Sequence, residues 1–208
     1  MGGREAAGAG GGSERACGPG TVSAIVDDFD DGVISGPWTP SNDPSVVESG
    51  GLLQLTPGSE AEDVHGVQTE VGYSLLGCSI HAELVAPPRD GEAVVALFQL
   101  RNGTDAFVRW AVNETTIVAR MTDGASDLPS LPLALDPYAH RWLRIRESDG
   151  TVYFETSADG HTWATFMSGP TPSFADSARV SVRTHTVIDV QTPSTTVVQF
   201  DRVNVAPE

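Results

Sequence analysis

The carboxylates of Glu147 and Asp149 are the nearest approach in this chain to the paired acidic groups that glycoside hydrolysis requires. Such groups must project toward one bond, whereas Asp149 directly precedes Gly150, and Asp-Gly is typical of a tight turn. The sequence has no Gly-x-Ser-x-Gly nucleophile motif, and its five histidines are scattered over hairpins and strand ends. On these grounds the sequence favours a chain that is not an enzyme.

A second group of side chains lies where alternation along strand-like runs predicts one polar face. In the run 140–147, Trp142, Arg144 and Arg146 alternate with Leu143 and Ile145, which are expected to face the core. An outward aromatic ring suits stacking on a sugar, and guanidinium groups suit two-pronged contacts with acidic sugars. The predicted carbohydrate-binding residues are Trp142, Tyr153, Arg109, Arg144, Arg146, Arg183, Glu155 and His81.

The same face has a second interpretation, in which its charged side chains form a solvent-facing lattice. Arg144 or Arg146, paired across strands with Glu155 or Glu83, would contribute about 0.2–1 kcal/mol per pair. Trp142 favours the binding interpretation, because an outward Trp without a cover or a ligand is unusual. The sequence leaves both interpretations open, and they differ on whether Trp142 is accessible.

The charge balance excludes two classes of partner. The 208 residues carry 28 acidic and 12 basic groups, a net charge of −16, and every residue counted as basic is arginine. Such a surface repels nucleic acid and anionic membranes. No apolar run approaches the ~18 residues of a membrane helix, so membrane insertion is not expected either.

The two cysteines, Cys17 and Cys78, lack metal-ligand spacing, so zinc is not expected. In an oxidising compartment a disulfide between them would fasten the N-terminal segment to a strand. The sequence is equally compatible with two unpaired thiols.

Strands must position all of these side chains, because short runs rich in Val, Ile, Thr and aromatics are broken by Gly, Asp and Asn. No helical period is sustained, which predicts an all-β antiparallel two-sheet sandwich. Residues 1–20 are expected to form a flexible Gly/Ala-rich leader, and residues 21–208 one domain. The expected strands are Val22–Phe29, Ser45–Glu48, Leu52–Thr56, Val64–Glu70, Cys78–Ala86, Ala93–Arg101, Ala106–Val112, Thr116–Thr122, Arg141–Glu147, Thr151–Ser157, Thr162–Met167, Arg179–Thr184 and Thr195–Val205.

Three phrases stand out in combination: Asp27–Gly32 followed by Trp38, then Arg141–Arg146, then Tyr153–Trp163. Together they resemble the concanavalin A-like lectin/glucanase superfamily, specifically its laminin-G-like domains in secreted bacterial proteins. The likeness covers about residues 22–206 and implies a jelly-roll sandwich. Hydrolytic members of that superfamily carry a Glu-x-Asp-x-x-Glu strand, whereas here Val152 stands at the position of the third carboxylate.

One structural calcium ion is the cofactor that the resemblance implies. The superfamily often places calcium near the joined first and last strands, and by that likeness Asp28, Asp30 and Asp201 would supply carboxylates. Calcium takes six to eight oxygen ligands in loose geometry. The acidic phrase at 27–32 is not an EF-hand loop, however, and acids that cap turns beside the first strand are the alternative.

Taken together, these features predict a non-catalytic carbohydrate-binding or adhesion module that uses its polar and aromatic sheet face. The alternative is a structural or protein-interaction domain of a surface assembly, and a more distant one is a glycosidase or lyase. The expected partner is a glycan or a surface protein. The expected location is extracellular or in the cell envelope of a bacterium, although residues 1–20 contain no visible export signal.

Overall fold

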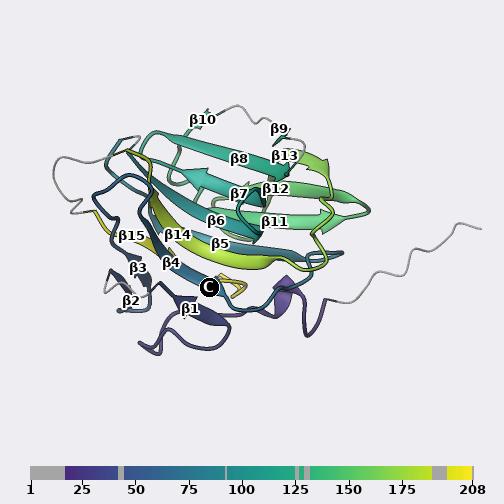
Figure 1. Cartoon of the computed structure of the whole chain (residues 1–208), viewed down its shortest axis with the longest axis horizontal. Helices are drawn as coiled ribbons and strands as arrows, with labels where there is room; N and C mark the ends of the chain where they lie inside the picture. Colours follow the sequence, from purple (N-terminus) through teal and green to yellow (C-terminus); the bar gives the residue numbers. More distant parts are fainter. Residues whose placement is uncertain are drawn as a thin grey trace, which may run out of the picture.

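Two antiparallel β-sheets make up the fold (Figure 1). The computed structural model of the chain describes residues 17–41, 45–91, 93–124, 127–128, 132–188 and 196–207. The first sheet has eight strands in the order β1-β4-β14-β6-β7-β8-β10, with β9 also paired to β8. Its strands are β1 (Trp38–Pro40), β4 (Val64–Thr69), β6 (Val94–Asn102), β7 (Ala106–Val112), β8 (Thr116–Asp123), β9 (Asp127–Leu128), β10 (Leu133–Ala134) and β14 (Arg179–Thr186).

The second sheet has seven strands in the order β13-β12-β11-β5-β15-β3-β2. A single turn of 3-10 helix, η1 (Val22–Ala24), precedes the first strand. The strands of the second sheet are β2 (Val46–Glu48), β3 (Leu53–Leu55), β5 (Ser79–Ala86), β11 (Trp142–Ser148), β12 (Thr151–Ser157), β13 (Ala164–Pro170) and β15 (Val198–Asp201).

The hydrophobic core lies between the sheets, where alternate residues of each strand meet. In β7, Val108, Trp110 and Val112 belong to this core, while the residues between them point outward. The Trp110 ring meets Phe154 of the other sheet edge-on at 5.4 Å between centroids, and its Nε1 donates to the Arg144 carbonyl at 3.1 Å. Trp110 therefore fastens the two layers to each other.

The predicted two-sheet β sandwich is confirmed, and most expected strands are present with small shifts at their ends. The expected first strand, Val22–Phe29, is wrong. There the chain forms η1 and then a single bridge between Asp27 and Val203. It turns because Phe29 has a positive φ of 52° and its N–H donates to the Asp27 carboxylate at 2.9 Å. The short strands β1, β9 and β10 have no counterpart in the prediction.

Strand order decides which outward side chains become neighbours. The consecutive strands β6, β7 and β8 lie in the eight-stranded sheet, and β11, β12 and β13 lie in the seven-stranded sheet. Near the C-terminus, β14 inserts between β4 and β6, whereas β15 inserts between β5 and β3 (Figure 1). Arg109 on β7 and Arg183 on β14 therefore lie on a different sheet from Trp142 on β11.

A disulfide joins Cys17 to Cys78, with 5.6 Å between their Cα atoms. Residues 1–16, most of the predicted leader, lie outside the described residues. In the described part of the chain, no helix is long and apolar enough to cross a membrane.

Candidate functional site

The outward face of the seven-stranded sheet carries six of the eight predicted sugar-binding residues, and it is closed. Trp142, the residue expected to stack on a sugar, is only 2% exposed. It lies under the turn that follows β12: a Cβ on Gly160 would meet the indole at 3.0 Å and Pro207 at 2.7 Å. His81 fills the space beside it, with ring centroids 5.9 Å apart. The prediction that Trp142 is accessible is therefore wrong.

The charged residues of this face are also engaged with one another. Arg144 Nε donates to Glu155 at 2.7 Å, and Arg146 Nη2 donates to the other carboxylate oxygen at 3.0 Å. The Arg144 guanidinium lies 4.1 Å from the Trp163 ring centroid, and that of Arg146 lies 4.3 Å from the Tyr153 centroid. His81, Trp142, Arg144, Arg146, Tyr153 and Glu155 thus form a packed lattice, which corrects their assignment to a sugar site.

Glu155 is the centre of this lattice. Burial raises the pKa of its carboxyl group, but the hydrogen bonds and charges of Arg146 and Arg144 outweigh burial, so the net shift is downward from 4.5. A group with a lowered pKa stabilises the fold above its unfolded-state pKa, and this contribution is lost as the pH falls through the folded-state pKa.

We expect Glu155→Gln to lower the free energy of unfolding at pH 7 by about 1–3 kcal/mol, because two guanidinium groups lose a charged acceptor. The difference from wild type should shrink as the pH falls below 4.5, because the unfolded carboxyl group protonates there while the folded one, with its lower pKa, follows at more acidic pH. Urea unfolding at pH 7 and pH 3.5 measures both. Glu62→Gln is the control because Glu62 is largely exposed, and a difference that does not change with pH would contradict this account.

The outward face of the eight-stranded sheet gathers five of the twelve arginines. We call it the arginine face, meaning the outward side chains of β14, β6, β7 and β8. Two pairs lie directly opposite each other across neighbouring strands, Arg179 with Arg101 and Arg109 with Arg120. Arg183 lies four residues along β14 from Arg179. Of the predicted sugar-binding set, only Arg109 and Arg183 belong to this face.

Three of the five arginines of this face have close neutral partners. Arg101 Nε donates to the Gly103 carbonyl at 2.9 Å, and Arg183 Nη2 donates to the Gln68 side chain at 3.1 Å. The Arg109 guanidinium lies 4.0 Å from the Phe107 centroid, and its buried Nε has no hydrogen-bond acceptor. Within the described ranges, none of the five arginines forms an ion pair with a carboxylate.

Two of these guanidinium groups are strongly affected by their surroundings. Burial, assisted by the charge of Arg120, lowers the pKa of Arg109 to about 10, although Asp127 acts in the opposite direction. Burial, assisted by the charge of Arg101, lowers the pKa of Arg183 to about 10. Both remain protonated at neutral pH, but the positive charge costs free energy there.

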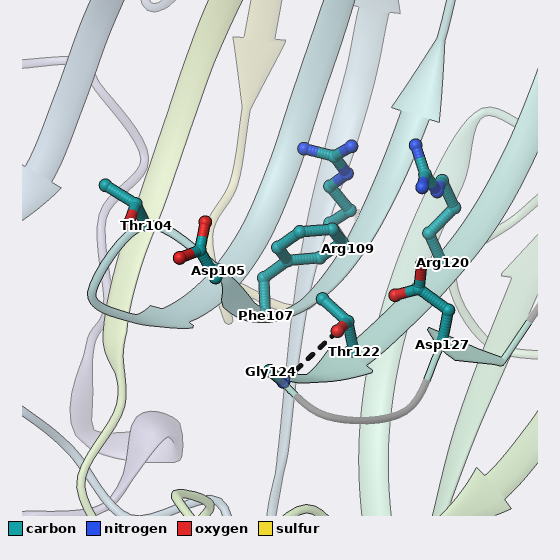
Figure 2. Close-up of a pocket in the computed structure, with 8 residues that line it drawn as sticks. All are labelled: Thr104, Asp105, Phe107, Arg109, Arg120, Thr122, Gly124 and Asp127. Carbon is teal, nitrogen blue, oxygen red and sulfur yellow. Dashed lines mark hydrogen bonds between the residues drawn. The ribbon is translucent and has the colours of Figure 1, made fainter.

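A pocket of about 380 Å³ opens on this face around the Phe107 ring (Figure 2). Arg109 and Arg120 extend their guanidinium groups in the same direction on one side of the ring. Asp105, from the turn before β7, and Asp127, from β9, lie on either side of it (Figure 2). The residues that line the pocket are Thr104, Asp105, Phe107, Arg109, Arg120, Thr122, Gly124 and Asp127.

Two further hollows follow the same face. One, of about 290 Å³, includes Gln68 and Arg183, and the other, of about 830 Å³, includes Arg101 and Arg179. The sequence prediction missed Arg101, Arg120 and Arg179 as members of the site. Their outward position follows from the same alternation that placed Arg109 and Arg183.

The carboxylates of the molecule differ in their availability. Glu147 accepts from Gly77 N–H, Gly150 N–H and the Thr171 hydroxyl, so it holds turns together. The central strands β14, β6 and β7 contain no Asp or Glu at all. Asp105 and Asp127 are therefore the carboxylates that lie within reach of a molecule bound over Phe107.

The three predicted calcium ligands lie close enough to influence one another. The charge of Asp28 raises the pKa of Asp30, and burial raises that of Asp201, with Asp28 adding a smaller contribution. Among the described side chains, however, no group of three or more Asp, Glu, His or Cys residues is arranged to hold a metal ion. The arrangement of these carboxylates in the described residues does not match a calcium site.

Calcium binding stays a prediction that a melting experiment decides. If Asp28, Asp30 and Asp201 bind the ion, 1 mM calcium should raise the melting temperature over that in chelator, because a ligand bound only to the folded state stabilises it. Asp30→Asn should remove the rise. Equal melting temperatures with calcium and with chelator would refute the prediction.

Comparisons with known proteins identify the fold. No protein-family model matches the sequence, and no curated protein matches it significantly. Among solved structures, a xylan β-1,4-xylosidase from Bacillus halodurans C-125 is similar over 86% of this chain with a TM-score of 0.64 and 18% identity. This chain spans only 38% of that xylosidase.

Two other similar structures match over nearly their whole length. A prokaryotic β-1,3-1,4-glucanase (lichenase) from a mouse hindgut metagenome gives a TM-score of 0.61 at 10% identity, covering 88% of this chain and 99% of its own. The exoplasmic/lumenal domain of VIP36, solved with Ca²⁺ and Man2 bound, gives 0.56 at 14% identity, covering 88% of each chain.

These comparisons correct two expectations. The chain was expected not to be an enzyme and to act as a non-catalytic binding or adhesion module, whereas the similar structures are predominantly glycoside hydrolases. The laminin-G-like part of the resemblance has no support among them and stays a prediction. At these identities the likeness establishes the fold alone. The chain has a concanavalin A-like jelly-roll fold, which it shares with these glycosidases and with the VIP36 domain.

Proposed function

We propose that this protein is a glycoside hydrolase that cleaves a polysaccharide lying across the arginine face. The observation that carries the proposal is the pocket around Phe107, where Asp105 and Asp127 lie on either side of an aromatic ring (Figure 2). An aromatic surface with two flanking carboxylates has the components that glycoside hydrolysis needs. Known glucanases with a similar fold support this chemistry.

The two carboxyl groups have complementary roles in this proposal. One, as the acid, protonates the oxygen of the leaving sugar, and the other, as the base, takes a proton from the water that attacks the anomeric carbon. Because β8 separates β7 from β9, those backbones lie about 10 Å apart. We expect carboxyl groups carried by backbones this far apart to be more widely spaced than the ~5–5.5 Å of retaining enzymes, leaving room for the attacking water as in inverting ones. We therefore expect inversion at the anomeric carbon.

The remaining pocket residues would hold the sugar. The Phe107 ring presents an apolar surface on which a sugar ring can stack, and the Arg109 guanidinium packs against that aromatic ring at 4.0 Å from its centroid. Thr104 also lines the pocket and carries a hydroxyl suited to hydrogen bonds with a sugar.

An extracellular or periplasmic location accords with this activity. The disulfide between Cys17 and Cys78 favours an oxidising compartment, because such bonds are rare in the cytosol. Polysaccharides of walls and matrices are also found outside the cytoplasm. The location is part of the proposal, as is a bacterial source.

The assay for this function is release of reducing ends from a panel of polysaccharides at pH 5–7. The panel contains xylan, laminarin and lichenan as neutral polymers, and polygalacturonate, alginate and chondroitin sulfate as anionic ones. We expect release from at least one polymer, with the new reducing end in the inverted configuration by NMR. No release from any of the six at micromolar protein would overturn the proposal.

A further inference from the structure

The arginines of the two sheets differ in whether they form ion pairs. On the seven-stranded sheet, Arg141, Arg144 and Arg146 each contact a buried glutamate. On the arginine face, the five arginines have no carboxylate partner within the described residues, although the chain carries a net charge of −16. The chain has 28 acidic residues for 12 basic ones, so a shortage of carboxylates does not explain why the arginines of this face lack ion pairs.

The arrangement is costly for the isolated protein. Like charges directly opposite each other across strands destabilise a sheet, and the arginine face contains two such pairs, Arg101 with Arg179 and Arg109 with Arg120. The Nε–H of Arg109 is buried without an acceptor, and an unsatisfied charged donor lowers the stability of the fold. An anion bound between the members of each pair would relieve the repulsion between their guanidinium groups.

The positions of the pairs indicate the shape of that anion. The Arg101–Arg179 pair spans β6 and β14, whereas the Arg109–Arg120 pair spans β7 and β8. The two pairs are two strand spacings apart across the sheet and two residues apart along it, which together give about 12 Å. Arg183 lies four residues, about 13 Å, along β14 from Arg179. A single small anion cannot bridge such distances, but a polymer with anionic groups at intervals can.

We propose that the ligand of the arginine face is an anionic polysaccharide, whose carboxylate or sulfate groups bind the two arginine pairs and Arg183. This inference rests on the proposed function for its choice of a glycan. Guanidinium groups form two parallel hydrogen bonds with a carboxylate or a sulfate, which an ammonium group cannot do. The Phe107 ring lies beside the Arg109–Arg120 pair and accepts the apolar face of the sugar that carries the charge.

Binding is measured separately from cleavage, by calorimetry with purified protein. The probes are oligogalacturonate as a carboxylated chain, a chondroitin sulfate oligosaccharide as a sulfated one, laminarin oligosaccharide as a neutral one, and single-stranded DNA. We expect one anionic glycan to bind, with an affinity that falls as salt rises from 50 to 300 mM. Which of the two anionic glycans binds identifies the charged group.

The variants Arg109→Gln and Arg179→Gln should each weaken this binding about tenfold to a hundredfold, since each removes a charge-assisted hydrogen bond. Arg89→Gln, at an exposed arginine in the loop between β5 and β6, has the same change in charge and should bind like wild type. Melting curves check folding: the two variants should melt at or above the wild-type temperature, because each removes an unpaired charge.

The outcomes separate this inference from the proposed function. Binding of an anionic glycan that the arginine variants lose, even without release of reducing ends, supports the inference and counts against hydrolysis. Cleavage of a neutral polymer alone, unaffected by Arg109→Gln and Arg179→Gln, overturns the inference and leaves the hydrolase intact. DNA binding as tight as that of the glycans overturns the choice of a polysaccharide.

Discussion

Asp105→Asn and Asp127→Asn are each expected to lower kcat by about 10²–10⁴-fold, because each removes one of the two proton-transfer groups of the proposed reaction. The amide keeps the size of the side chain and loses its acid–base chemistry. Both residues are exposed at the rim of the pocket, so the melting temperature should stay close to that of wild type. The measurement is the rate of release of reducing ends from the best polymer in the panel.

An activated aryl glycoside distinguishes the two roles. A good leaving group needs no protonation, so the variant that has lost the acid should recover with this substrate, and the variant that has lost the base should not. Asp149→Asn is the matched control, because Asp149 lies in the β11–β12 turn on the other sheet. If both pocket variants kept wild-type activity, the assignment of Asp105 and Asp127 would fail.

Trp142→Ala is expected to lower the free energy of unfolding by about 3–5 kcal/mol while leaving glycan binding unchanged. The indole is 2% exposed and lies against the turn at Gly160, so truncation leaves a cavity under that turn. Trp142 lies on the outward face of the seven-stranded sheet, whereas the Phe107 pocket lies on the outward face of the eight-stranded sheet. Denaturant unfolding and calorimetry measure the two effects.

Tyr138→Ala provides the contrast for stability, since that ring is 74% exposed and its loss should change stability by less than about 0.5 kcal/mol. Trp142→Phe keeps the protein folded if the alanine variant does not survive purification. Loss of glycan binding in Trp142→Phe, with folding intact, would restore the seven-stranded face as a binding surface.

Local signals in the sequence predict much of this fold. Alternation in β11 places Leu143 and Ile145 in the core, and Asp149-Gly150 closes the hairpin to β12 as an Asp-Gly turn should. The strand predicted for Val22–Phe29 is absent because the apolar residues of this segment resemble those of a strand, whereas the backbone turns. There the Asp27 side chain accepts from the backbone N–H of Phe29 and turns the chain.

The candidate site was less predictable, because it depends on which strands become neighbours. Alternation shows that Arg109 and Arg144 both point outward, but it contains no information on the sheet to which each belongs. Insertion of β14 between β4 and β6 brings Arg179 opposite Arg101, a pairing of residues 78 positions apart that no local pattern predicts. The turn at Gly160 that lies against Trp142 also lies against Pro207, near the C-terminus, and no local pattern predicts that contact.

The most direct test of the account follows the arginine Nε–Hε signals by NMR while an anionic oligosaccharide is added to ¹⁵N-labelled protein. The signals of Arg109 and of the Arg101–Arg179 pair should shift as oligogalacturonate or the chondroitin sulfate oligosaccharide binds. Those of Arg144 and Arg146, held by Glu155, should stay in place. Shifts confined to Arg144 and Arg146, or no shift with either oligosaccharide, would contradict the claim that the arginine face is the functional site.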